Sequence, residues 1–216
     1  MRTLIAIPCM DTIHTLFFSS YLKLRKPAEG ETVTAVTTSS LVYDARNTLA
    51  SLAVNGGYDR VMWLDSDMTF GPDILERFHA DLDEGREMVC GNFFTRKAPI
   101  RPVIYDRLEE IGPDGQLVNV SHPYEDYPRD SVFPVAGCGF GAVMMTTDLL
   151  RRVGDAFGAP FTPLPTHGED FAFCIRARHV GATVWCDSRI KLGHAGVSII
   201  NETTWDAIRG GDKHGH

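Results

Sequence analysis

The chain has 216 residues, of which 44% are hydrophobic and 23% are charged, and its formal net charge at pH 7 is −7. A composition this close to that of average globular proteins excludes a collagen-like, coiled-coil or intrinsically disordered chain. The negative charge disfavours binding to bulk nucleic acid or to anionic membranes. Because no apolar run approaches the roughly 20 residues that a membrane-spanning helix requires, we expect no membrane span.

Cysteine usage and the N-terminus predict the compartment. The five cysteines are widely spread and contain no CxxC pair, so neither a disulfide framework nor a zinc site is indicated. They are Cys9, Cys90, Cys138, Cys174 and Cys186. The first residues lack the apolar length and the cleavage site of a signal peptide. We therefore expect a cytoplasmic protein with reduced cysteines.

The first half of the chain alternates strand and helix patterns. Strands are predicted from apolar or β-branched runs at residues 4–7, 31–37, 61–64 and 87–92. Helices are predicted where apolar residues recur every three or four positions, over 42–53 and again after Pro72 and Asp73. This alternation predicts an α/β fold whose central, mostly parallel mixed sheet carries helices on both faces.

The second half is more irregular. Residues 103–105 and 117–120, joined through Asp114-Gly115, predict a hairpin excursion, and the Pro- and Tyr-rich segment 122–131 predicts an exposed loop. An apolar run at 142–145, a helix over 171–178 and a strand over 182–186 follow. We expect one domain over residues 1–208 and a flexible tail over 209–216.

Two carboxylates follow the third predicted strand, in the run Trp63-Leu64-Asp65-Ser66-Asp67. The carboxyl ends of strands face the crevice in which α/β sheets bind ligands. Paired carboxylates supply the hard oxygen ligands that Mg²⁺ and Mn²⁺ prefer, and such an ion can neutralise a leaving diphosphate. The plainer alternative is that Asp67 caps a turn before Pro72.

A second acidic pair, Glu169-Asp170, precedes the helix predicted over 171–178. One of them can serve as a general base that deprotonates an acceptor hydroxyl, or either can simply cap the helix. Ahead of the pair, the Pro- and Gly-rich loop 158–168 is a candidate mobile lid.

Three further features are consistent with a binding site. His194, flanked by Gly193 and Gly196, can reach a metal as a neutral imidazole, or it can be structural. Arg46 can meet a phosphate or a base edge, or it can be an exposed helical arginine. The alternating glycines around Gly139 allow close backbone approach to a ligand, but they do not form a dinucleotide-binding fingerprint.

The order of these motifs resembles the glycosyltransferases of the GT-A fold, in particular the family 2-like group. The run Ala45-Arg46-Asn47 together with Trp63 to Asp67 is also similar to mannan-polymerase-type mannosyltransferases. The resemblance covers about residues 3–196. It implies a GT-A-like nucleotide-sugar-binding sandwich and a UDP- or GDP-sugar donor whose sugar moves to a hydroxyl acceptor of unknown identity.

The resemblance also implies a role for each motif. Asp65, Asp67 and His194 would hold Mn²⁺ or Mg²⁺, and Asp170, with Glu169 beside it, would be the catalytic base. The donor would be bound by Pro8, Cys9, Asp11, Arg46, Asp65, Ser66 and Gly139. The chain departs from the family pattern in lacking an evident acceptor module and a membrane anchor, which points to a soluble acceptor or to a partner protein.

Two other classes of protein remain open. Asp65-Ser66-Asp67 also fits the nucleophile motif of haloacid-dehalogenase-like phosphatases, with Asp65 attacking phosphorus. Those enzymes carry the motif after the first strand and need a later acidic pair, whereas Cys174 stands four residues after Asp170 here. A sugar nucleotidyltransferase fits less well, because residues 8–12 offer no glycine-rich basic loop. A non-catalytic nucleotide-sugar or glycan-binding domain is the remaining alternative.

Overall fold

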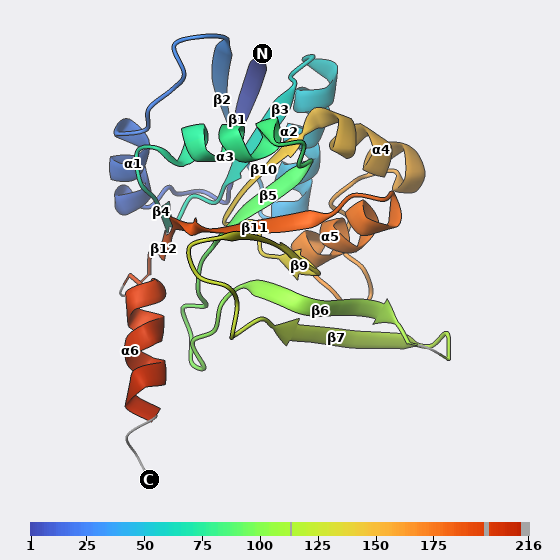
Figure 1. Ribbon diagram of the computed structural model, residues 1–216. Coiled ribbons are helices and arrows are strands. Elements are labelled where there is room, and N and C mark those ends of the chain that lie inside the picture. The colour runs from blue at the N-terminus through green and yellow to red at the C-terminus, as the bar shows by residue number, and fades with distance from the viewer. Residues whose placement is uncertain (113, 197–198, 213–216) are drawn as a thin grey trace.

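The computed structural model describes residues 1–112, 114–196 and 199–212. Its centre is a seven-stranded sheet in the order β2-β1-β3-β10-β5-β11-β8 (Figure 1). These strands are β1 (Arg2–Cys9), β2 (Glu31–Thr38), β3 (Arg60–Leu64), β5 (Met88–Asn92), β8 (Val132–Val135), β10 (Ala142–Thr146) and β11 (Val184–Lys191). β1 pairs in parallel with β2 and β3, and β5 with β11, while β10 and β8 run antiparallel to their neighbours. The predicted α/β fold with a mixed, mostly parallel sheet is confirmed.

Helices cover both faces of this sheet because the buried strands are apolar on both sides. Leu4 and Ala6 of β1 pack in one core with α2 (Val42–Asn55), α4 (Thr147–Phe157) and α5 (Glu169–His179). Ile5 and Ile7 pack in a second core with α1 (Thr15–Leu22) and α3 (Ile74–Asp83). Alternate residues of a strand point to opposite faces, so β1 contributes to both cores.

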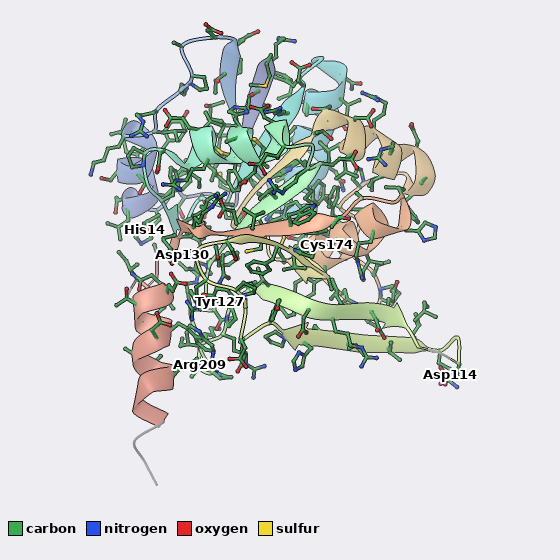
Figure 2. The ribbon with its side chains drawn as sticks, in the orientation of Figure 1. His14, Asp114, Tyr127, Asp130, Cys174 and Arg209 are labelled. Atoms are coloured by element: carbon green, nitrogen blue, oxygen red, sulfur yellow. The ribbon has the colours of Figure 1, made fainter. Side chains whose placement is uncertain are left out.

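Smaller elements surround the sheet. The predicted hairpin is confirmed as β6 (Ile104–Ile111) and β7 (Leu117–Pro123), and β9 (Gly137–Cys138) pairs with β6. Asp114 lies at the tip of this hairpin (Figure 2). β4 (Met68–Thr69) and β12 (Gly193–His194) form a two-stranded pair, and α6 (Glu202–Asp212) follows.

The structure differs from the sequence-based expectations in three places. The sequence patterns do not predict helices α1, α4 and α6. For α4 a signal was present, because Thr146 is its N-cap and accepts a hydrogen bond from the Leu149 amide at 3.2 Å. Segment 122–131 is not wholly exposed, because Tyr127 is 3% exposed and stacks on Phe133. Residues 209–212, expected in a flexible tail, belong to α6, and residues 213–216 of that tail lie outside the described residues. No helix in the described part of the chain is long and apolar enough to cross a membrane.

Candidate active site

A cleft of about 1040 Å³ opens at the carboxyl ends of β1 and β3. These strands are parallel neighbours, so the segments that follow them meet at one edge of the sheet. The cleft is lined by residues that come from these and more distant segments. They are Pro8, Cys9, Met10, Asp11, Thr12, His14, Val42, Arg46, Asp65, Ser66, Asp67, Phe93, Thr95, Arg96, Lys97, Ala98, Pro99, Arg101, Val103, Tyr105, Ser121, Pro123, Phe140, Glu169, Asp170 and His194.

This cleft contains every predicted site residue except Gly139. Gly139 lies behind two lining residues, where its amide donates to the Val103 carbonyl at 3.0 Å. A Cβ atom at Gly139 would lie 2.7 Å from Val103 Cγ1 and 2.8 Å from Phe93 Cζ. The glycine therefore allows the wall of the cleft to pack closely, rather than lining it itself.

Arg46 links two of the acidic motifs. Its guanidinium donates to Asp65 Oδ1 through Nη2 at 2.8 Å and to Glu169 Oε1 through Nε at 3.4 Å. The Arg46 side chain is 3% exposed, so the alternative of an exposed helical arginine is wrong. Burial raises the pKa of Asp65 despite the charge of Arg46, and the nearby Asp67 and Glu169 charges add to that rise.

Asp67 faces one guanidinium and one imidazole. Its Oδ2 atom lies 3.0 Å from Arg96 Nη1 and 3.5 Å from His194 Nε2. Burial raises the pKa of Asp67, but the hydrogen bond from His194 and the charges of His194 and Arg96 outweigh it, so the pKa is lowered overall. Asp67 is thus held as a carboxylate that lines the cleft.

The imidazole of His194 is oriented by its other nitrogen. Nδ1 lies 2.9 Å from the Phe94 carbonyl oxygen, which can only accept, so Nδ1 carries the proton. The Phe93 ring packs against His194 nearly perpendicularly, with ring centroids 5.3 Å apart. Nε2 is the ring nitrogen that faces Asp67. It donates to this carboxylate when the ring is doubly protonated, and its lone pair points there, open to a metal ion, when the ring is neutral. Metal-binding histidines are typically fixed in this way.

The cleft residues differ in their fit to a divalent cation. In the described part of the chain, no group of three or more His, Cys, Asp or Glu side chains is arranged to hold a metal ion. Asp65 is engaged by Arg46 and Asp67 by Arg96, but Asp67 Oδ2 also faces His194 Nε2 at 3.5 Å. The carboxylate oxygen suits Mn²⁺ or Mg²⁺, and the imidazole nitrogen favours Mn²⁺ of the two. Such ions commonly use one or two protein carboxylates together with substrate phosphates, so the Asp67–His194 pair fits the expected cofactor.

Asp170 lies at the start of α5 and is partly exposed to the cleft. Its Oδ1 accepts a hydrogen bond from the Phe171 amide at 2.8 Å, whereas the N-cap residue of α5 is Gly168. Burial of the carboxyl, and then the charge of Glu169, raise the pKa of Asp170 to about 7. A carboxylate with this pKa is suited to accept a proton near neutral pH.

One part of the cleft is not predicted by any sequence motif: the loop of residues 95–101, which we call the cationic loop. It presents Arg96, Lys97 and Arg101. Thr95 closes it, because Thr95 Oγ1 accepts from the Arg101 amide at 3.0 Å and donates to the Pro99 carbonyl at 3.0 Å. Three cations soon after the strand predicted at 87–92 were the available signal.

Loop 158–168, the candidate lid, is anchored away from the cleft. The Phe161 amide donates to Asn47 Oδ1 at 2.9 Å, and Arg176 donates to the Pro160 carbonyl at 3.0 Å. None of its residues is among the described residues that line the cleft. The mobile-lid hypothesis therefore gains no support from this loop.

Comparisons with known proteins agree on the fold. No family model and no curated protein matches the chain. Among solved structures, A197 from STIV is similar over 93% of this chain and 94% of its own, with a TM-score of 0.64 and 19% identity. GalNAc-T7 with UDP, GalNAc and Mn²⁺ has a TM-score of 0.60 and 11% identity, covering 90% of this chain and 43% of its own. TarS 1–349 of S. aureus has a TM-score of 0.53 and 14% identity, covering 87% and 58%.

These neighbours include glycosyltransferases with a GT-A-like fold, so the predicted GT-A-like architecture is confirmed. At 11–19% identity, the likeness defines the fold and leaves the activity of this chain to its own residues. The similarity to mannan-polymerase-type mannosyltransferases remains a prediction from two short motifs.

Proposed function

We propose that the protein is a metal-dependent glycosyltransferase that moves a sugar from a nucleoside-diphosphate donor to an acceptor hydroxyl. One observation carries the proposal: the Asp67–His194 pair and the Asp170 carboxyl, from segments far apart in sequence, line the same cleft. The fold likeness to GalNAc-T7, whose structure contains UDP, GalNAc and Mn²⁺, supports it.

Each group has a distinct task in this proposal. Asp170 accepts the proton of the acceptor hydroxyl, which makes that oxygen a better nucleophile. Arg46 holds Asp65 and Glu169 in place and neutralises part of their negative charge. The repulsion that opposes ionisation of Asp170 is therefore smaller. Pro8, Cys9 and Asp11 line the part of the cleft proposed to bind the nucleoside, next to Ser66.

The proposed cofactor is Mn²⁺ or Mg²⁺, held by Asp67 and His194. When bound, it supplies positive charge that stabilises the leaving diphosphate. We propose a UDP- or GDP-sugar as donor and a cytoplasmic reaction. The compartment is supported by the five free cysteines.

A thermal-shift panel tests donor and metal together. UDP, GDP, CMP and ADP are each added with and without Mn²⁺, because a ligand that binds only the folded state raises the melting temperature. A Mn²⁺-dependent shift for one nucleoside diphosphate supports the proposal. A shift only with Mg²⁺ and phosphate mimics would instead favour a phosphatase that uses Asp65 as its nucleophile.

A further inference from the structure

One guanidinium in the cleft lies where it competes with a metal ion. Arg96 Nη1 contacts Asp67 Oδ2 at 3.0 Å and donates to the Ala195 carbonyl at 2.9 Å. His194 Nε2 lies 3.5 Å from the same Asp67 oxygen. A metal ion held by this oxygen and this nitrogen would meet the guanidinium as a like charge, which is unfavourable at such short range.

The Arg96 side chain reaches into the cleft from a loop that it does not itself hold closed. Its side chain is 45% exposed, and it extends from the cationic loop. The hydrogen bonds that close this loop are made by Thr95 and by backbone groups rather than by the Arg96 side chain. A guanidinium that leaves Asp67 would remain among cleft-lining groups, with Lys97 and Arg101 as its cationic neighbours.

From this arrangement we infer that Arg96 exchanges partners during donor binding. It neutralises Asp67 when no metal is bound, and it turns to the diphosphate of the donor when the metal takes Asp67 and His194. The inference rests on the proposed function, because it takes the donor to be a nucleoside-diphosphate sugar. Guanidinium–phosphate hydrogen bonds are charge-assisted and often bidentate, so the diphosphate is a stronger partner than the single contact that a partly exposed Arg96 makes with Asp67.

The exchange couples the two ligands. Metal alone has to displace Arg96 without compensation, whereas metal with a nucleoside diphosphate gives the displaced guanidinium a new partner. Each ligand therefore raises the affinity for the other, and by linkage the effect is reciprocal. The cleft would bind free Mn²⁺ weakly and the metal–diphosphate pair tightly.

Mn²⁺ binding, followed by the electron paramagnetic resonance signal of the free ion, tests the first half without any substrate. We expect Arg96→Gln to tighten the binding of Mn²⁺ alone about two- to fivefold, the range that corresponds to the loss of a half-exposed ion pair. Lys97→Gln is the matched control. It removes a cation from the same loop, and in the described part of the chain Lys97 forms no ion pair with a carboxylate. Unchanged Mn²⁺ affinity in Arg96→Gln, with a melting temperature like that of the wild type, would overturn the inference.

UDP and GDP, titrated at saturating Mn²⁺, test the second half. We expect Arg96→Gln to weaken the binding of the nucleotide about tenfold, through the loss of a charge-assisted contact, and Arg96→Lys to restore part of the affinity. Opposite effects on Mn²⁺ and on the nucleotide are the signature, because a merely structural role would weaken both. Tighter Mn²⁺ binding with unchanged nucleotide affinity overturns the transfer to the diphosphate.

The inference and the proposed function can fail separately. If neither nucleotide binds the wild type, the proposed function and the transfer of Arg96 to the diphosphate fail, while the Mn²⁺ measurement still decides whether Arg96 competes for Asp67. If a nucleotide binds equally well with and without Mn²⁺ and is lost in Arg96→Gln, the inference is overturned. Arg96 would then serve as a permanent counter-charge.

Discussion

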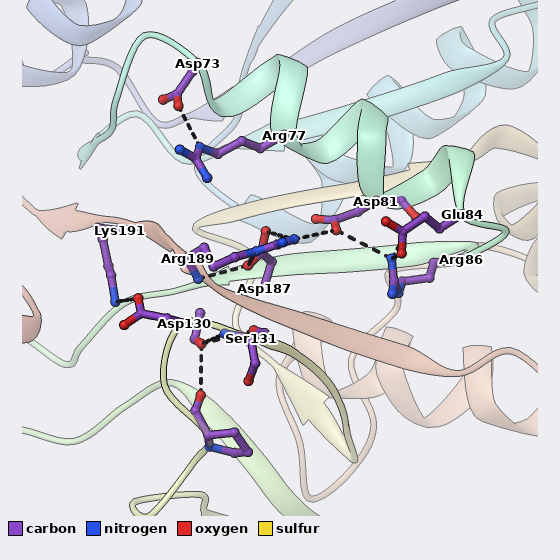
Figure 3. A network of polar contacts seen from close by, with 12 residues as sticks. Asp73, Arg77, Asp81, Glu84, Arg86, Asp130, Ser131, Asp187, Arg189 and Lys191 are labelled. Carbon is purple, nitrogen blue, oxygen red and sulfur yellow. Dashed lines mark hydrogen bonds and ion pairs between the residues drawn. The ribbon is translucent and has the colours of Figure 1, made fainter.

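Two groups of carboxylates in this protein have similar charges but different surroundings. In the cleft, Asp65 and Asp67 lie against Arg46 and Arg96. Between α3 and β11, Asp81 and Asp187 lie against Arg189, whose Nε donates to Asp187 Oδ1 at 2.8 Å and whose Nη2 donates to Asp81 Oδ1 at 3.1 Å (Figure 3). In the cleft each of the two carboxylates has its own arginine, whereas Arg189 bridges Asp81 and Asp187.

The regions differ in access to solvent. The Asp65 and Asp67 side chains are 30% and 29% exposed, whereas those of Asp81 and Asp187 are 2% and 0% exposed. Burial, and then the charge of Asp187, raise the pKa of Asp81 to about 7, the value found for Asp170 in the cleft. A raised pKa therefore does not by itself single out Asp170, the proposed base, because Asp81 shares it. The two carboxyls differ in position, since Asp170 lines the cleft and Asp81 does not.

The largest expected effect is on turnover, where a substitution in the cleft and one in the buried pair should differ most. Asp170→Asn removes the proposed base, so we expect turnover to fall about 10²- to 10⁴-fold while donor affinity is retained. Asp81→Asn alters a carboxyl of similar pKa outside the cleft, and its turnover should match that of the wild type. Steady-state kinetics with a donor identified by the thermal-shift panel measures both. Full activity in Asp170→Asn would show that the base is assigned to the wrong residue.

Removing one arginine from each region compares how much each carboxylate pair depends on its cation for the free energy of unfolding. Arg46→Met leaves Asp65 and Glu169 without a buried partner, which should reduce the free energy of unfolding by about 3 kcal/mol. Arg189→Met leaves Asp81 and Asp187, which are 2% and 0% exposed, without their shared guanidinium, so the loss should be at least as large, about 3 to 5 kcal/mol. Urea denaturation of the two variants measures both losses, and a smaller loss in Arg189→Met than in Arg46→Met would contradict the greater burial of the Asp81–Asp187 pair.

The pH dependence of the free energy of unfolding tests the buried Asp81–Asp187 pair separately from the cleft. The pKa of Asp81 is raised above its ordinary value of 3.8 to about 7, so the folded state binds this proton more tightly than the unfolded state. The stabilisation is fully present below pH 3.8 and is lost as the pH rises to about 7. Relative to Asp81→Asn, the wild type should lose on the order of 4 kcal/mol over this window. Denaturation at several pH values measures it, with Asp83→Asn as an exposed control on the same helix. Parallel curves for the wild type and Asp81→Asn would rule out this coupling.

The last prediction concerns the pH dependence of catalysis. Asp170 has to be ionised to accept a proton, and its raised pKa of about 7 places this ionisation in the neutral range. Turnover should therefore increase about tenfold per pH unit below pH 7 and level off above it. A pH–rate profile tests this, since a profile that is flat from pH 5 to 8 would exclude a base with this pKa.

Much of the site could be predicted from local sequence patterns. The apolar run of residues 61–64 ends at Asp65, and the helix over 171–178 is preceded by Glu169 and Asp170. Because parallel strands in an α/β sheet point their carboxyl ends to one edge, the order of strands and motifs along the chain is enough to assign such motifs to one cleft. The structure brings them together as expected.

The pairing of charges could not be predicted in this way. Arg46 lies 123 residues from Glu169 along the chain, and Arg96 meets Asp67 only because the segments after β3 and β5 share one edge of the sheet. Likewise, Asp81 and Asp187 come together where α3 packs on β11. Periodicity shows which face of an element is apolar, but not which distant element will cover it.

The sequence by itself therefore determined the alternation of strands and helices, the GT-A-like class and the carboxylates and histidine of the cleft. Only the tertiary structure decided that Arg46 is buried, that Gly139 lies behind the wall of the cleft and that Arg96 forms an ion pair with Asp67. The reason is physical. Backbone preference and apolar spacing act over a few residues. Charge pairing and burial depend on which strands lie next to one another in the sheet, and these come from distant parts of the chain.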